Sequence, residues 1–529
     1  MLKKILSLLI VVFIISCKNE PKEITTKKLP VEDPISHVII RPIPLKSLEN
    51  KSDSIRLFYK KFKEYEIWHN DENRMDLIHE IKFCNQDGLM PHDYNYDKIL
   101  TLENKRKKLT DIEITNYDIL LTESFEKLAK HLHCGKTNPK DIYEDWDIPL
   151  KSIALSDKLL NAINTNMIAT CFKEIKPKHL TYSSLKRSLA MLDDFPKYNF
   201  KKISLEKKIE ANDTIKTIIE IKKRLMYWKD FRNRDSIITP VYDERAVIAI
   251  KKFQKRHGLK PDGVIGNGTI KALNFSTEER KEQVYANLER WKWFPDDFGT
   301  EYLIINLPDY SLNYVVNQDT IADRRVVVGK PKRKTPIISS KLSNFVFNPT
   351  WTVPPTIIKE DLTPSATKNR GYFSRTQITI YDSKGKEVTV KDWNPNNAKS
   401  YRYVQTSGYN NSLGLVKFNF PNRHSVYLHD TNHRDYFVKE YRALSSGCIR
   451  IENPLQLSEI ILKKENDKNW NNSEIDTIIK NKKTKYIPLK NSDINIYIFY
   501  WTSWSNNEGL QFREDIYDSD QTLYKALRN

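Results

Sequence analysis

The sequence has few cysteines, and the apolar run at its start is short. Among 529 residues there are five cysteines, too few and too scattered for the disulfide framework of a small secreted domain. The apolar run Ile5–Ile15 is too short for a comfortable membrane span. Neither a disulfide scaffold nor a membrane-spanning protein is therefore expected.

The sequence also lacks a paired cluster of metal ligands and a concentrated basic tract. His131, His133 and Cys134 are close together, but no second cluster accompanies them, and the two histidines would face different sides of a helix. We expect a helix end here, with no metal and no cofactor. The net charge of +19 is spread over Lys-rich helix faces, which argues against nucleic acid but allows attraction to an anionic polymer or membrane surface.

The first 38 residues are typical of an export signal and a tether. Lys3 and Lys4 precede the apolar run, which ends at Ser16 and Cys17 in "IISC", a sequence that resembles a bacterial lipobox. The alternative is a signal anchor with an incidental cysteine. Residues 18–38 are polar and Pro-containing, as in a linker. We expect a lipid on Cys17 and a location on the periplasmic face of the cell envelope, anchored in the outer membrane.

The length predicts two to four domains, and 39% hydrophobic residues indicate a folded protein. Residues 39–205 have a mostly helical pattern, with a helix stop at Gly135 and Pro139. From about residue 285 the pattern changes to strands, predicting a β domain over 285–490. The polar stretch at about 355–405 predicts an inserted cap. Residues 491–529 are expected to form a C-terminal strand and tail that pack on the scaffold or the β domain.

Residues 214–276 form a second helical unit. The stretch "AIKKFQKRHGLKPDGVIGNGTIKALN" resembles the peptidoglycan-binding type 1 domain, a three-helix module, and matches its FQxxxGLxxDGxxGxxT framework. Most of the matched positions would be core or turn residues, such as Phe253, Leu273 and Gly263. The resemblance implies the fold more strongly than wall binding, since such modules also act as spacers.

Cys448 stands in "RALSSGCIRIENP", and it is either a buried thiol or a nucleophile. His429 ends the apolar strand "SVYLH" nineteen residues earlier, and a His at a strand end can meet a Cys at a neighbouring turn. A nearby imidazole activates a thiol. The small residues Ser446 and Gly447 would let the backbone approach a substrate, with the N–H groups of Gly447 and Cys448 facing an oxyanion.

Arg450 would point to the same strand face as Cys448 and could hold a substrate carboxylate. The alternative is a structural salt bridge to Glu452 or Asp430. Tyr427, two residues before His429, is a candidate pocket wall or a core aromatic residue. Trp351 is a weaker candidate of the same kind.

The stretch "HDTNHRDYFVKEYRALSSGCIRIENP" resembles the active-site signature of the L,D-transpeptidase (YkuD-like) family. Further segments, including "NLERWKWFPDDFGTEYLIINLPDYSL" and "NSLGLVKFNFPNRHSVYLHDT", resemble its large YcbB-like branch over about residues 40–529. Two departures stand out: Ser446 replaces a histidine common in the family, and "TSGYNNSLG" replaces an expected Pro-Gly-rich stretch. The first leaves His429 as the favoured base.

The resemblance implies an α+β multidomain protein: a mixed β-sandwich catalytic domain with an inserted cap, a three-helix peptidoglycan-binding module and a mostly helical N-terminal scaffold. It implies that Cys448 attacks a peptidoglycan stem peptide, with His429 as general base, and that an amine acceptor resolves the thioester to a 3-3 crosslink. It also implies that carbapenems acylate Cys448.

Two other functions fit the same residues. Water could resolve the acyl-enzyme, which would make the protein a carboxypeptidase or endopeptidase. A non-catalytic lipoprotein that tethers the membrane to peptidoglycan would have a decayed site, yet His429, Gly447, Cys448 and Arg450 are all present. The sequence identifies no protein partner.

Overall fold

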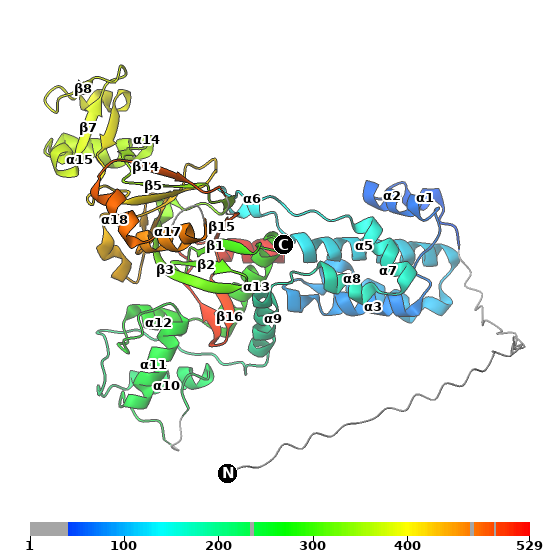
Figure 1. Ribbon diagram of the computed structural model, residues 1–529. Coiled ribbons are helices and arrows are strands. Elements are labelled where there is room, and N and C mark those ends of the chain that lie inside the picture. Colours follow the sequence, from blue (N-terminus) through cyan, green and yellow to red (C-terminus); the bar gives the residue numbers. More distant parts are fainter. Residues whose placement is uncertain (1–40, 233–236, 466–469, 491–492) are drawn as a thin grey trace, which may run out of the picture.

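The computed structural model describes residues 41–232, 237–465, 470–490 and 493–529. Figure 1 shows four parts: a helical scaffold region, a three-helix module, a central main sheet, and a cap that projects from that sheet. The predicted leader, Cys17 and the tether 18–38 lie outside the described residues. Among the described residues no helix is long and apolar enough to cross a membrane.

The scaffold region is helical because its apolar residues recur at helical spacing. Its longest helix, α5, has a capping box of Thr110 and Glu113 at one end and Gly135 at φ 89° at the other, which confirms the predicted helix end. The helices are α1 (Leu45–Leu48), α2 (Asp53–Lys61), α3 (Asp71–Lys82), α4 (Tyr96–Asn104), α5 (Asp111–Cys134), α6 (Pro139–Ile142), α7 (Leu155–Thr165), α8 (Ile168–Ile175) and α9 (Leu180–Asp193).

The three-helix module comprises α10 (Thr217–Tyr227), α11 (Glu244–Arg256) and α12 (Asn267–Leu273), as predicted. Gln254 fixes its central turn: the side chain accepts from the Gly263 N–H at 2.9 Å and donates to the Val264 carbonyl at 2.9 Å. Gly263 has φ 81°, a conformation that a side chain disfavours. The module has a hydrophobic core of its own, which includes Ile221, Phe253 and Leu273.

Helix α13 (Thr277–Trp293) leads from the module into the main sheet and is buried along most of its length. Its Trp291 stacks on Trp501 with ring centroids 4.4 Å apart. The C-terminal helix α19 (Asp520–Arg528) packs against α13. Leu185 and Leu189 of α9 also join the core under the main sheet, so the last scaffold helix packs with the β domain.

The main sheet has eleven strands in the order β14-β5-β10-β11-β13-β3-β2-β1-β15-β4, with β12 paired to β3. It mixes parallel and antiparallel pairs and curls on itself, which confirms the α+β class. The strands are β1 (Glu301–Asn306), β2 (Ser311–Val316), β3 (Asp319–Gly329), β4 (Ile338–Lys341), β5 (Asn344–Phe347), β10 (Val416–Asn419), β11 (Leu428–His429), β12 (Ala443–Ser445), β13 (Ile449–Ile451), β14 (Lys485–Pro488) and β15 (Asn495–Phe499). Helices α17 (Pro454–Leu462) and α18 (Asn472–Lys480) connect β13 to β14.

The C-terminal segment is an integral part of this sheet. We predicted a β domain over 285–490 and a C-terminal strand and tail that pack on the scaffold or the β domain; the strand, β15, lies inside the sheet, between β1 and β4. Four of its five residues are buried, because an internal strand is covered on both faces. The chain then forms the hairpin of β16 (Ser503–Asn506) and β17 (Gly509–Phe512) before α19.

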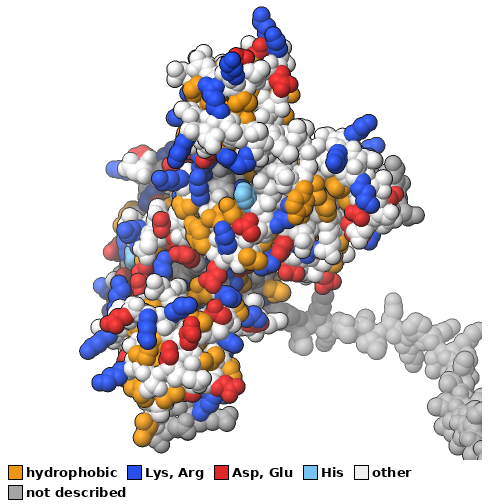
Figure 2. Space-filling view, turned by 90° about the vertical axis from the view of Figure 1, so that its left-hand side faces the viewer, with side chains coloured by type: hydrophobic (Ala, Val, Ile, Leu, Met, Phe, Trp, Pro, Cys, Tyr) orange, Lys and Arg blue, Asp and Glu red, His pale blue; other side chains and the backbone are white. Residues whose placement is uncertain are grey.

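The cap is a second, smaller α+β unit with its own core around Leu362, Phe373 and Trp393. Its sheet has the order β6-β9-β7-β8, and Figure 1 shows it projecting from the main sheet. Its elements are β6 (Trp351–Thr352), α14 (Pro355–Ile357), a π-helix η5 (Ile358–Leu362), α15 (Thr363–Lys368), α16 (Tyr372–Thr376), β7 (Ile378–Tyr381), β8 (Glu387–Val388) and β9 (Arg402–Gln405). Figure 2 shows Lys and Arg side chains dispersed over the molecular face rather than gathered in one patch.

Candidate active site

Three adjacent strands carry the candidate residues. Lys417 on β10 is paired with His429 on β11, and His429 is paired in turn with Arg450 on β13. One residue back, Leu428 and its partner Ile449 are fully buried in the hydrophobic core. Because side chains alternate along a strand, Lys417, His429 and Arg450 form a row on the opposite face of the sheet.

A second row lies next to the first. The Ile449 N–H donates to the Tyr427 carbonyl at 3.2 Å, which places Tyr427 beside Cys448. Both residues precede core-facing positions, so their side chains share the face of His429 and Arg450. The structure thus brings the predicted Cys448, His429, Tyr427 and Arg450 together on neighbouring strands.

The surroundings of the Cys448 thiol favour its protonated form. Burial raises its pKa, while hydrogen bonds from the Tyr427 backbone and hydroxyl, together with the charges of Lys417 and Arg450, act in the opposite direction. The sulfur lies 4.0 Å from the Ser425 carbonyl oxygen. A base is therefore required to generate the nucleophilic thiolate.

The surroundings of His429 favour its neutral form. The residue is 5% exposed, and burial lowers its pKa to about 3, with the nearby Arg450 and Lys417 acting in the same direction. An interaction with the Asp430 backbone acts in the opposite direction and raises the pKa. Nδ1 nevertheless makes no hydrogen bond of ordinary geometry within the described residues. The Asp430 carboxylate does not orient the ring, because it accepts from the Leu415 N–H at 2.8 Å and from Arg434 at 2.5 Å.

The loop before Cys448 is held by a closed set of hydrogen bonds. Ser445 Oγ accepts from the Gly447 N–H at 3.2 Å and donates to the Cys448 carbonyl at 2.6 Å, while Thr335 Oγ1 donates to the Gly447 carbonyl at 2.8 Å. Gly447 has φ 116°, which favours glycine. The Gly447 N–H is thus engaged by Ser445 in this structure, and its role toward an oxyanion stays a prediction.

Arg450 has no carboxylate partner among the described residues. Its Nε and Nη1 are buried without a hydrogen bond, and its guanidinium carbon lies 5.6 Å from the Tyr436 ring centroid. The alternative of a structural salt bridge is wrong on both counts: Glu452 pairs with Arg325, and Asp430 pairs with Arg434. Unsatisfied donors of this kind are rare in folded proteins and fit an external acceptor.

Two contacts connect the cap to this site. The Trp351 side chain at the start of the cap lies close enough to the Tyr427 hydroxyl to lower its pKa, against the larger raising effect of burial. Arg333 donates from Nη1 to the Ser446 hydroxyl at 2.8 Å and pairs with Glu360 and Asp361 of the cap. Ser446 thus serves as an anchor point for the cap, which its sequence position alone did not indicate.

Sequence reasoning missed Lys417. Its ammonium lies 3.9 Å from the Tyr427 ring centroid, a cation–π distance, and burial lowers its pKa while Cys448 raises it. The signal was the alternation in "LVKFNF", where Val416 and Phe418 are core residues and Lys417 must face the other side.

The histidine cluster of the scaffold has structural contacts. His131 Nδ1 lies 3.0 Å from the Tyr94 hydroxyl, and His133 Nδ1 lies 2.9 Å from the Ile175 carbonyl. Among the described residues no group of three or more His, Cys, Asp or Glu side chains could hold a metal ion.

Comparison with protein families decides the identity of the β domain. Residues 300–494 match the model of the L,D-transpeptidase catalytic domain. This part of the chain is an L,D-transpeptidase catalytic domain. Residues 216–273 match a peptidoglycan-binding domain, and 53–189 match a scaffold domain.

Individual proteins give a similar result. A Haemophilus influenzae protein named "Putative L,D-transpeptidase" is 36% identical over 269 residues, which are 49% of this chain and 54% of that protein. The match thus spans about half the length of this relative.

Two solved structures are also similar in part. They are L,D-transpeptidases from Stackebrandtia nassauensis (12% identity, 55% of this chain, 94% of that one, TM-score 0.22) and Xylanimonas cellulosilytica (13%, 56%, 100%, 0.17). At such TM-scores they carry no argument about the catalytic domain.

Proposed function

We propose that the chain is a peptidoglycan L,D-transpeptidase that joins stem peptides by 3-3 crosslinks through a thioester on Cys448. The observation that supports this best is a thiol and a neutral histidine on one sheet face, beside an arginine with buried, unpaired donors. An acyl transfer needs these three elements: a nucleophile, a base and a group that orients an anionic substrate.

In the first half-reaction His429 takes the Cys448 proton, and the sulfur attacks the carbonyl of the third stem residue. The negative charge on the carbonyl oxygen is stabilised by the Tyr427 hydroxyl and the Cys448 N–H, since the Gly447 N–H is engaged elsewhere. The C–N bond then breaks, His429 returns the proton to the leaving amine, and terminal D-Ala departs.

In the second half-reaction an amine from another stem peptide attacks the thioester. His429 accepts a proton from this amine, the new amide forms, and the departing sulfur is reprotonated. Arg450 holds a carboxylate of the donor stem through its buried Nε and Nη1, and Trp351 fixes the Tyr427 hydroxyl from the cap. Lys417 provides positive charge next to the developing thiolate.

The test is intact-protein mass spectrometry on the chain lacking residues 1–17, with Cys448→Ala as control. A carbapenem adduct on wild type alone, and a disaccharide-tetrapeptide dimer lacking one D-Ala, would support transpeptidation. Release of D-Ala without dimer would favour the hydrolytic alternative. No adduct and no turnover in either protein would contradict Cys448 chemistry and favour the tethering lipoprotein.

We also propose that the chain is an exported lipoprotein, modified on Cys17 and held at the periplasmic face of the outer membrane. The "IISC" motif and the polar stretch 18–38 support this. Metabolic labelling with a radioactive fatty acid should label the wild type and not Cys17→Ala. Equal labelling of the two would contradict it.

A further inference from the structure

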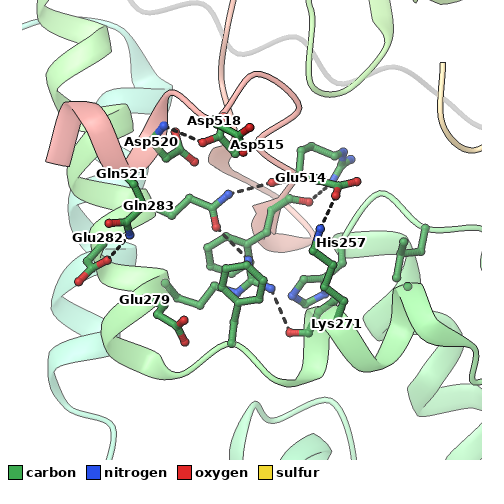
Figure 3. A pocket seen from close by; sticks show the side chains of 17 residues that line it. His257, Lys271, Glu279, Glu282, Gln283, Glu514, Asp515, Asp518, Asp520 and Gln521 are labelled. Atoms are coloured by element: carbon green, nitrogen blue, oxygen red, sulfur yellow. Dashed lines mark hydrogen bonds and ion pairs between the residues drawn. The ribbon is translucent and has the colours of Figure 1, made fainter. Parts of the chain in front are cut away.

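A pocket of about 500 Å³ lies where the three-helix module, α13 and the C-terminal segment meet (Figure 3). This volume is within the range of small-ligand sites. The module provides one wall, with Lys271 and Ala272 from α12, and the segment after β17 provides the opposite wall. Neither part forms the pocket alone.

Arg280 of α13 lines the pocket and is 4% exposed. Its guanidinium carbon lies between two rings, 4.1 Å from the Phe275 centroid and 4.3 Å from that of Phe512. Nη1 donates to Gln283 at 2.8 Å, and Nη2 donates to the Ala272 carbonyl at 3.1 Å. The side chain is thus fixed in position, as a recognition group requires.

This buried cation has no directly bonded counter-ion among the described residues, where no carboxylate forms an ion pair with Arg280. The pKa of Arg280 is lowered to about 9, chiefly by burial and next by the like charge of Arg256, while the more distant Glu279 and Asp520 act in the opposite direction. Because a buried charge without a directly bonded partner is costly, a ligand anion would be stabilised here.

The carboxylates around the pocket differ in whether they have an ion-pair or hydrogen-bond partner. Glu282 is bonded to Gln521, Glu514 pairs with Lys271, and Asp520 pairs with Arg290. Asp518 differs: it is exposed, has φ 56°, and its carboxylate contacts no cation among the described residues. Within the part of the chain that the structure describes, the pocket therefore has one cation without a directly bonded carboxylate and one carboxylate without a cation partner.

We propose that this pocket binds a peptide or amino acid whose free α-carboxylate contacts Arg280 and whose ammonium group faces Asp518. Two sources have this chemistry, a peptidoglycan stem peptide and a free amino acid. The choice of the stem peptide as probe rests on the proposed function, while the pocket itself does not.

The test is calorimetric titration of the full chain after carbapenem acylation of Cys448, verified by intact mass. If Cys448 is not acylated, the proposed function fails, and the same titrations proceed on Cys448→Ala. The probes are a stem tetrapeptide, the same peptide with a C-terminal carboxamide, and D-alanine. Arg280→Gln should weaken binding of the carboxylate form by about tenfold or more and abolish its preference over the carboxamide.

Asp518→Asn should weaken binding by about threefold, since an exposed contact is worth less. Gly268→Phe should block the pocket, because Gly268 lines it and an added Cβ would have no neighbour nearer than 3.5 Å. Binding of tetrapeptide alone or of D-alanine alone supports the pocket and identifies the source.

Equal affinity of the parent and a folded Arg280→Gln, or of carboxylate and carboxamide, would overturn the proposal. If Arg280→Gln does not fold, binding that survives Gly268→Phe would overturn it instead.

Discussion

The buried Asp118 of the scaffold region and the buried polar groups of the candidate active site differ in whether they have partners. In the scaffold, the Asp118 carboxylate accepts from the Tyr59 hydroxyl and from the N–H groups of Ile67 and Trp68, at 2.6–2.9 Å. At the candidate active site, His429 Nδ1 and two nitrogens of Arg450 are buried without a hydrogen bond of ordinary geometry to any described residue. Buried polar groups that have hydrogen-bond partners stabilise a fold. Buried polar groups that lack them are typical of sites where a ligand supplies the missing partner.

The largest expected effect is that of Cys448→Ala. It should reduce D-Ala release from a tetrapeptide by more than about 10³-fold, because the nucleophile is lost. The melting temperature should stay within about 2 °C, since the contacts of the thiol with Ser425 and Tyr427 are weak ones to sulfur. A chromatographic assay of D-Ala measures the first, and scanning calorimetry the second. Residual turnover at the wild-type rate would contradict the assignment of the nucleophile.

Asp118→Ala tests the scaffold side of the comparison. It leaves the N–H groups of Ile67 and Trp68 buried without an acceptor, so the free energy of unfolding should fall by about 3 kcal/mol. Urea denaturation followed by far-UV circular dichroism measures this. Carbapenem acylation of the folded fraction should be unchanged. The matched control is Asp157→Ala, an exposed acid in a surface ion pair.

Arg450→Met should have the converse outcome. It should reduce kcat/KM for the tetrapeptide by about 10–100-fold, because a charge-assisted contact to the donor carboxylate is lost. It should not lower the free energy of unfolding, because burial already lowers the pKa of this uncompensated cation. Loss of stability with unchanged kcat/KM would instead make Arg450 a structural residue.

Lys417→Met should shift the reactivity of Cys448. The pKa of the thiol, already raised by burial, should rise further when a nearby positive charge is removed. The rate of alkylation by iodoacetamide, measured from pH 6 to 10, should therefore fall by about tenfold at pH 8. Lys417→Arg should preserve the wild-type profile. Identical profiles for all three proteins would exclude an electrostatic role.

The smallest effect concerns pH and His131. Burial lowers the pKa of this scaffold histidine to about 4, against an ordinary value of about 6.5. The unfolded chain therefore takes up a proton before the folded one, and stability is lost as pH falls from about 6.5 towards 4. His131→Gln should reduce the stability difference between pH 7 and pH 5 by about 1 kcal/mol, measured by urea denaturation. An unchanged difference would contradict a neutral buried His131.

The features that could be predicted from the sequence are those that depend on residues close together along the chain. The helix end at Gly135 and the change from helices to strands followed from capping signals and the change of period, whereas the three-helix module and the α+β class followed from the resemblance to known families. Cys448 and His429 could be picked out because a strand end and a Gly-Cys turn are local features. Their meeting on one sheet face depends on the pairing of β11 with β13.

Other features depend on contacts between distant segments. Lys417 joins the site only through the register of β10 on β11, and the Gly447 N–H is engaged by a hydroxyl whose direction no motif encodes. The bond from Arg333 to Ser446 likewise spans 113 residues. The pocket at Arg280 needs three parts of the chain, so no single stretch of sequence predicts it.

The position of β15 has a consequence for the timing of folding. β15 pairs with β1, and their partners Tyr302 and Asn495 are almost two hundred residues apart along the chain. Contacts of such sequence separation form late, because a long loop must close first. The sheet that carries the candidate active site is thus incomplete until β15 has been added to it. A chain that has not yet placed β15 would have the cysteine and the histidine without the complete framework that aligns them.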